Sequence, residues 1–211
     1  SVVGLIGSAD VLKAAGTSLD LSSTTLTNIF NLSAGSTSAT SFTIDASDLQ
    51  GVAGIVGNTG SDTLTVKSTD VDLSVKGLSS IEVIKAGLST ATTFSVEDTQ
   101  LASGGSITGG AGVDTLDVSS SGGATAVNLS STTLSSVEKL VSGGFIVNQA
   151  DLASGGTVDT SALVAADTQL DLRSTALSGI EVLKAGVSSA TTFTVDQGDL
   201  AEIQTVAGST G

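Results

Sequence analysis

The chain has 211 residues and a formal net charge of −14, and it contains no Pro, Cys, Met, Trp, Tyr or His. A hydrophobic share of 39% excludes a disordered chain, and the acidic balance excludes nucleic acid as a partner, because phosphate binding needs clustered Lys and Arg. The absence of Cys excludes disulfides, and no apolar run is long enough for membrane insertion. We expect one repeat domain over residues 1–211, cut from a longer protein.

An imperfect repeat organises the whole chain. Its two most similar copies share Ile-Glu-Val, Lys-Ala-Gly and Ala-Thr-Thr-Phe in the same order, within residues 81–94 and 180–193. The copies start 52, 56 and 43 residues apart, and the third is short because its middle is trimmed. We divide the chain into a partial copy over 1–18, complete copies over 19–70, 71–126 and 127–169, and a truncated copy over 170–211.

Short strands separated by turns are predicted throughout each copy, with few helical residues. Single helical turns are predicted at 8–15 and 46–49. In the second copy, apolar and polar residues alternate with period 2 and favour Val, Ile, Thr and Phe, between clusters of Gly, Ser and Asp. This pattern predicts strands at 71–75, 81–85, 93–96, 106–108 and 115–118.

The fold class that these elements predict is all-β, a β-solenoid of the parallel β-helix or β-roll kind built from about four imperfect repeats. The interior must be thin, because large side chains are scarce and aromatic residues make up only 2% of the chain. The alternative is a row of tandem β-sandwich domains. We favour the solenoid, because one copy is too short for an immunoglobulin-like sandwich and no Trp or Tyr marks a sandwich core.

Four of the five Phe residues occupy one position of the repeat: Phe42, Phe94, Phe145 and Phe193. Equivalent positions of a solenoid stack along its axis. We therefore expect these rings to form part of an internal ladder, in preference to an exposed aromatic strip.

Two segments combine closely spaced glycines with Asp. They are Gly-Gly-Ala-Gly-Val-Asp-Thr-Leu-Asp at 109–117 and Gly-Asn-Thr-Gly-Ser-Asp-Thr-Leu-Thr at 57–65, and the third copy keeps only Gly-Gly-Thr-Val-Asp at 155–159. The first segment resembles the nonapeptide of RTX proteins, whose turns hold Ca²⁺ between successive coils. The resemblance implies Asp62 and Asp114 as calcium ligands. It makes the following residues the candidate calcium site: Gly109, Gly110, Gly112, Asp114 and Asp117, with Gly57, Asn58, Gly60 and Asp62.

The segments depart from the RTX pattern in one respect. RTX nonapeptides follow one another directly, so that neighbouring loops complete each site, whereas here they occur singly. A lone loop offers fewer oxygens than the 6 to 8 that Ca²⁺ takes. The alternative is that Gly and Asp only turn the coil and satisfy its main-chain groups, and both interpretations stay open.

A second acidic position follows each Phe. Oxygen-bearing or amide side chains stand three residues apart there, in the pairs Asp45 and Asp48, Glu97 and Gln100, Asn148 and Asp151, and Asp196 and Asp199. A helix N-cap is the interpretation we favour, because two of the four copies have lost a carboxylate. The alternative is a cation site shared between stacked copies, with Asp45, Asp48, Asp196 and Asp199 as candidate metal ligands.

The sequence does not point to an enzyme, because without His, Cys or Tyr few groups remain for acid–base or nucleophilic chemistry. Taken whole, the chain resembles the repeat regions of RTX-type bacterial surface proteins, which include S-layer proteins and large adhesins exported by type I secretion. The resemblance implies a secreted, calcium-dependent structural segment of a bacterial surface layer. The alternative is a stalk or binding region of an RTX adhesin. The partners that we expect for this chain are further copies of itself, other surface-layer subunits or a cell-surface polysaccharide.

Overall fold

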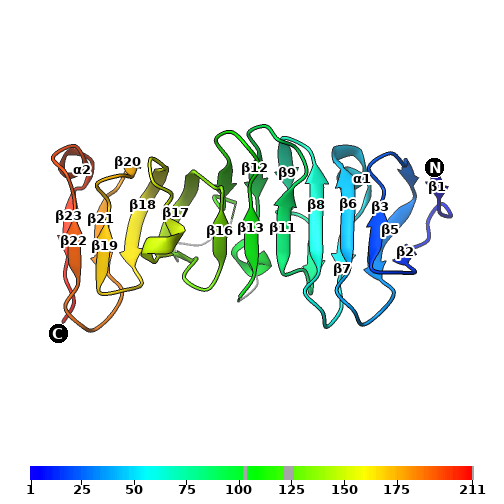
Figure 1. Cartoon of the computed structure of the whole chain (residues 1–211), viewed down its shortest axis with the longest axis horizontal. Helices are drawn as coiled ribbons and strands as arrows, with labels where there is room; N and C mark the ends of the chain where they lie inside the picture. The colour runs from blue at the N-terminus through cyan, green and yellow to red at the C-terminus, as the bar shows by residue number, and fades with distance from the viewer. Residues whose placement is uncertain (102–103, 121–125, 211) are drawn as a thin grey trace.

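The computed structural model describes residues 1–101, 104–120 and 126–210, and these residues form a parallel β-solenoid of about nine turns. Figure 1 shows the strands side by side along a rod, with the two termini at opposite ends. All strand pairings described are parallel. The predicted all-β solenoid is confirmed, and tandem sandwiches are excluded because their sheets are antiparallel.

The first 67 residues contain β1 (Val2–Val3), β2 (Asp10–Ala14), β3 (Ser18–Asp20), β4 (Leu26–Thr27), β5 (Ile29–Ala34), β6 (Ser41–Asp45), α1 (Ala46–Gly51), β7 (Gly54–Val56) and β8 (Thr63–Lys67). The second copy contains β9 (Asp70–Asp72), β10 (Gly77–Ser79), β11 (Val83–Ala86), β12 (Thr93–Ser95), the 3-10 turn η1 (Asp98–Gln100), β13 (Ser106–Thr108) and β14 (Thr115–Asp117). The third contains β15 (Val127–Asn128), β16 (Thr133–Ser135), β17 (Lys139–Val147), the 3-10 turn η2 (Gln149–Asp151) and β18 (Thr157–Ala165). The fourth contains β19 (Gln169–Asp171), β20 (Ala176–Ser178), β21 (Val182–Ala185), β22 (Thr192–Thr194), α2 (Asp199–Glu202) and β23 (Thr205–Ala207).

Each turn of the solenoid has three sides. Strands β8, β9 and β10 follow one another around the axis, and β11 then returns to lie on β8, with Ile84 opposite Leu64. In the same way β12 lies on β9, with Phe94 opposite Val71. Alternate residues of each strand point inward, so that a thin aliphatic core runs along the axis of the rod.

The sequence repeat and the solenoid turn differ in length. The first copy fills seven sides in the order β3, β4, β5, β6, α1, β7 and β8, and the second copy repeats that order from β9 to β14. Since a turn has three sides, seven sides make two turns and one further side. Each copy therefore starts one side further around the rod than the copy before it.

This rotation changes the expectation for the Phe residues. The rings of Phe42, Phe94 and Phe145 are fully buried, as predicted, and Phe193 near the C-terminus is half-buried. They do not stack on one another, however, because the rings of successive copies lie on different sides of the rod. Phe42, for example, lies between the aliphatic residues of β3 and β8. The expectation that equivalent rings stack on one another is therefore wrong, but Phe42 and Phe94 are each part of an internal ladder, as predicted, with aliphatic residues on both sides.

Two predictions of local secondary structure are wrong, one because of pairing with a neighbouring coil and one because of a corner. The helical turn expected at 8–15 is instead strand β2, because pairing with β5 on the next coil outweighs the local helical pattern. The strand expected at 71–75 ends at Asp72, whose carboxylate accepts the amide N–H of Ser74 at 3.0 Å and turns the chain. Val75 is consequently 79% exposed. The helical turn expected at 46–49 is confirmed within α1.

The third copy is shorter than the other complete copies, but it still forms the same number of sides of the solenoid. Strands β17 and β18 are nine residues long, and each runs over a corner that the other copies cross with a loop. The two strands pair from Lys139 opposite Thr157 to Val147 opposite Ala165. The trimmed middle of this copy is thus the loss of corner loops, while the stacking continues.

Candidate functional site

The two glycine–aspartate loops cross corners of the solenoid. One connects β7 to β8 and ends at Asp62, and the other connects β13 to β14 and ends at Asp114. Both Asp residues are 0% exposed. They are therefore interior carboxylates, which need hydrogen-bond donors to compensate for lost hydration.

Main-chain N–H groups supply those donors. Asp114 accepts the amide of Thr92, on the preceding coil, at 2.7 Å and the amide of Gly110, in its own loop, at 3.0 Å. Asp62 accepts the amides of Thr40 and Asn58, each at 2.6 Å. Each carboxylate thus joins its loop to the coil before it.

A glutamate on the following coil extends each connection. Oε2 of Glu138 accepts the amide of Asp114 at 2.9 Å, and Oε2 of Glu82 accepts the amide of Asp62 at 2.8 Å. These two Glu residues were not among the predicted site residues. The signal that could have identified them is a Glu that follows Ile or Val at the same point of the repeat, in Ile81-Glu82, Val137-Glu138 and Ile180-Glu181. Together the acidic pairs connect three successive coils.

The loop glycines are required by close approach between coils. A Cβ at Gly109 would collide with the carbonyl oxygen of Ser136, and one at Gly57 would collide with that of Ser80. Gly112 has a φ of +106°, where an L side chain is strained, and Gly60 and Gly110 pack against the backbone of the preceding coil.

Asn58 shapes the first of the two loops through its side-chain amide. Its Oδ1 accepts the amide of Gly60 at 2.6 Å, and its Nδ2 donates to the carbonyl of Ser38 at 2.8 Å. The loop is thereby held both to itself and to the preceding coil.

Two further predicted acidic residues lie outside these loops. Asp117 turns the next corner by accepting the amide of Ser119 at 2.9 Å. Asp159 lies on β18 in register with Val141, so the interpretation of 155–159 as a remnant loop is wrong. The third-copy equivalent of Asp114 is Ser161, whose carbonyl accepts the amide of Glu181 at 2.8 Å.

Asp45 and Asn148 cap the helical turns that follow Phe42 and Phe145, as the favoured interpretation predicted. Asp45 accepts the amides of Ser47 and Asp48 at 2.9 and 3.0 Å, and these contacts, with the Ser47 hydroxyl first among them, lower the pKa of its carboxyl. Asp196 accepts the amides of Gly198 and Asp199 at 2.7 and 3.0 Å.

The inner members of these pairs point into the solenoid. Asp199 is 5% exposed, and it accepts the amide of Asp196 at 2.9 Å. Asp48 is 1% exposed, and neither of its carboxylate oxygens has a hydrogen-bond partner. Burial, with the nearby charge of Asp45, raises the pKa of Asp48. A buried carboxyl stabilises a corner only if a hydrogen-bond donor or a positively charged group contacts it.

Within the part of the chain that the structure describes, no three acidic side chains surround one point. Each glycine–aspartate loop gathers one Asp and one Glu, and both carboxylate oxygens of Asp62 and of Asp114 already accept main-chain N–H groups. The two loops also lie on different corners, so neither completes the other. This geometry supports the interpretation of the loops as turns, and calcium binding there stays a prediction from the motif.

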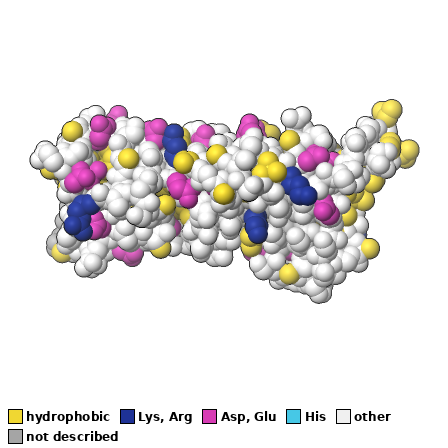
Figure 2. Space-filling view, turned by 45° about the horizontal axis from the view of Figure 1, so that its top comes forward, with side chains coloured by type: hydrophobic (Ala, Val, Ile, Leu, Met, Phe, Trp, Pro, Cys, Tyr) yellow, Lys and Arg dark blue, Asp and Glu magenta, His cyan; other side chains and the backbone are white. Residues whose placement is uncertain are grey.

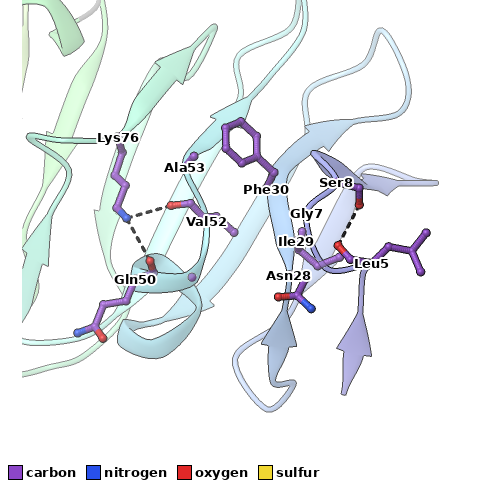
Figure 3. A pocket seen from close by; sticks show the side chains of 11 residues that line it. Leu5, Gly7, Ser8, Asn28, Ile29, Phe30, Gln50, Val52, Ala53 and Lys76 are labelled. Carbon is purple, nitrogen blue, oxygen red and sulfur yellow. Dashed lines mark hydrogen bonds between the residues drawn. The ribbon is translucent and has the colours of Figure 1, made fainter.

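A surface hollow of about 410 Å³ lies near the N-terminal end of the rod (Figure 3). Phe30, 48% exposed, and Leu5 contribute apolar surface. The ammonium group of Lys76 is tied back to the chain, because it donates to the carbonyls of Val52 at 2.9 Å and Gln50 at 3.4 Å. The lining residues therefore bring together no acid–base or nucleophilic pair.

Acidic side chains are spread over the face of the rod shown in Figure 2, with few basic ones among them. Arg173 pairs with Asp171 at 2.6 Å on the surface, and the hydrogen bond from Arg173 lowers the pKa of that carboxyl to about 2. Among the residues described, no helix has both the length and the apolar character of a membrane span.

Fold and corners together define a class of protein: a three-sided parallel β-solenoid whose corners are closed by Asp, Asn and Gly. Comparison with known proteins found no matching family model, no matching curated sequence and no matching solved structure.

Proposed function

We propose that this chain is a structural segment of a bacterial surface layer, secreted and dependent on calcium. The observation that carries the proposal is the parallel stacking of successive coils in the described part of the chain, whose buried side chains form one apolar core. Such a solid rod suits a load-bearing or spacing role, since every coil is held by both of its neighbours.

The charge of the chain supports calcium as the ligand of the assembled state. A net charge of −14 makes neighbouring rods repel one another in low salt. Divalent cations bridging exposed carboxylates on two rods would remove that repulsion and hold the rods side by side. In this proposal calcium acts between subunits, and the glycine–aspartate loops serve as turns.

Electron microscopy and sedimentation of the purified chain test the proposal. The samples contain millimolar CaCl₂, excess chelator, or NaCl or MgCl₂ at matched ionic strength. We expect ordered lateral assemblies in CaCl₂ alone and monomers in the other samples. A chain that stays monomeric in CaCl₂ is not a calcium-assembled layer component.

A second candidate function is the stalk of a secreted adhesin. The position of the two termini at opposite ends of the rod favours it, because a stalk must hold two other parts of a protein apart (Figure 1). A monomeric rod in all four samples supports the stalk, and binding of a cell-surface polysaccharide to the rod would indicate a binding region. We propose no catalytic activity for either function.

A further inference from the structure

Gln100 and Asp151 occupy the same position in two successive copies, at the end of the 3-10 turns η1 and η2. Oε1 of Gln100 accepts the amide of Glu97 at 2.8 Å. Its Nε2 donates to the carbonyls of Leu73 and Lys76, each at 2.6 Å. These carbonyls belong to the corner of the preceding coil. The two donated bonds of the Gln100 amide therefore tie that corner to its own turn, which the accepted bond holds in place.

The carboxyl of Asp151 is placed in the same way, but it lacks the donor. Its Oδ2 accepts the amide of Asn148 at 2.8 Å, as Oε1 of Gln100 accepts that of Glu97. The corner of the preceding coil repeats as well, because the amide of Thr132 donates to the carbonyl of Leu129 at 2.8 Å. A carboxylate here offers carbonyl oxygens no hydrogen, whereas a protonated carboxyl does.

We propose that Asp151 carries a proton in the folded solenoid and donates it to a main-chain carbonyl of the preceding corner, where Gln100 uses its amide. Ionisation of this one carboxyl then loosens the third copy, which makes the stability of the rod sensitive to mildly acidic pH. The proposal stands apart from the surface-layer function, since it concerns one interior group and no partner.

The surroundings of Asp151 favour the neutral form. The residue is 3% exposed and lines, together with Glu138, a narrow cavity that has no room for a water molecule. No Lys or Arg is among the described residues that line this cavity, and the nearby charge of Asp167 is also negative. Burial raises the pKa of Asp151 to about 6, Asp167 adds to the rise, and the amide of Asn148 opposes it.

A metal ion could also neutralise the buried carboxylate of Asp151, but it fits this cavity less well than a proton does. Calcium takes 6 to 8 oxygen ligands. The cavity brings the carboxyls of only two residues, Asp151 and Glu138, and the amide of Asp114 already occupies Oε2 of Glu138. A proton needs a single acceptor, and the carbonyls of Leu73 and Lys76 fill that role for Gln100 at the equivalent corner.

The sign of the pH effect is set by the direction of the pKa shift. Below about pH 4 both the folded and the unfolded chain carry the proton, so the group costs no stability there. As the pH rises from about 4 to about 6, the unfolded chain ionises and Asp151 in the folded chain does not, so the folding equilibrium weakens. Above about pH 6 the loss is complete and amounts to about 100-fold in the equilibrium constant.

Carboxyl NMR and urea denaturation of the whole chain, in chelator between pH 3.5 and 7.5, test the proposal. We expect one carboxyl resonance of the native protein to titrate near pH 6 and to be absent from Asp151→Asn. We also expect Asp151→Asn, which restores an amide donor, to gain up to about 100-fold in folding equilibrium over the native chain across this pH range. The exposed Asp70→Asn variant, the matched control, should follow the native curve.

Gln100→Glu provides the reciprocal variant, and it should acquire a loss of stability over the same pH window. The native resonance keeps the test decisive if a variant fails to fold. Titration of Asp151 near pH 4, or parallel pH curves for the native chain and Asp151→Asn, would overturn the proposal. Recovery of the lost stability by CaCl₂ at pH 7.5, but not by matched NaCl, would also overturn it and assign the position to a cation.

Discussion

Single polar residues hold the corners of this solenoid. Their contribution to the free energy of unfolding depends on whether their oxygens point into the core or toward solvent. The buried Asp114 receives two amide N–H groups, whereas the partly exposed Asp117 receives one at a solvent-facing corner. Both residues belong to the same nine-residue segment of the sequence. The two residues differ in burial. If Asp114 is substituted, main-chain N–H groups inside the core lose their acceptor, whereas the N–H group next to Asp117 can bond to water instead.

Asp114→Asn should lower the free energy of unfolding by about 2–4 kcal/mol, because the new NH₂ group must face a main-chain donor inside the core. Urea denaturation at neutral pH measures the loss. Asp117→Asn is the matched control and should change stability by less than about 0.5 kcal/mol, since an Asn side chain can make this kind of turn, as Asn128 does when its Oδ1 accepts the main-chain amide of Ser130. Equal losses in the two variants would show that the interior contacts of Asp114 carry no special weight.

At the scale of the elements, three-residue strands are stable only because they pair with strands of neighbouring coils. An isolated strand of this length has no independent stability. Strand β12 illustrates the point: it lies between β9 and β14, and Phe94 stands opposite Val71 and Leu116. The large ring fills the interior where its neighbours are smaller, so its loss leaves a cavity that the short strands cannot close.

Phe94→Ala should cost about 3–5 kcal/mol, as expected for removal of a buried aromatic ring. Thermal and urea denaturation provide the measurement. Phe30→Ala, at a ring that is 48% exposed, is the control and should cost no more than about 1 kcal/mol. If the two variants lose the same stability, the interior ladder is not the main support of the middle coils.

At the scale of the whole molecule, the negative charges of successive coils lie close together along the surface of the rod. The chain carries 21 acidic residues and 7 basic ones, and every coil exposes part of its surface. Exposed charges interact over about 30 Å at 0.01 M salt and over about 8 Å at 0.15 M salt. Several coils therefore repel one another at low ionic strength.

The melting temperature should consequently rise when NaCl increases from about 0.01 M to 0.15 M, because screening weakens the repulsion in the folded rod. Thermal unfolding followed by circular dichroism at pH 7 measures the change. Chloride and sulfate salts of sodium at equal ionic strength control for ion-specific effects. A melting temperature that falls or stays constant would mean that the acidic side chains are too far apart to repel.

Much of the solenoid could be predicted from the sequence alone. Alternation in short segments sets which residues face inward, and the repeated Phe position predicts burial because a large apolar ring gains most by leaving water. The caps at Asp45 and Asp196 were also predictable, since N-capping depends on a few neighbouring residues.

Only the tertiary structure decided which distant residues lie side by side. The mismatch between a seven-sided repeat and a three-sided turn moves equivalent residues to different sides, so Phe42 and Phe94 never meet. Stacking also gave Glu138 its role, because its partner Asp114 lies a full coil away in the sequence. Composition and spacing determine the local pattern, whereas the length of a turn, set by inter-coil hydrogen bonds and corner loops, determines which distant residues share a site.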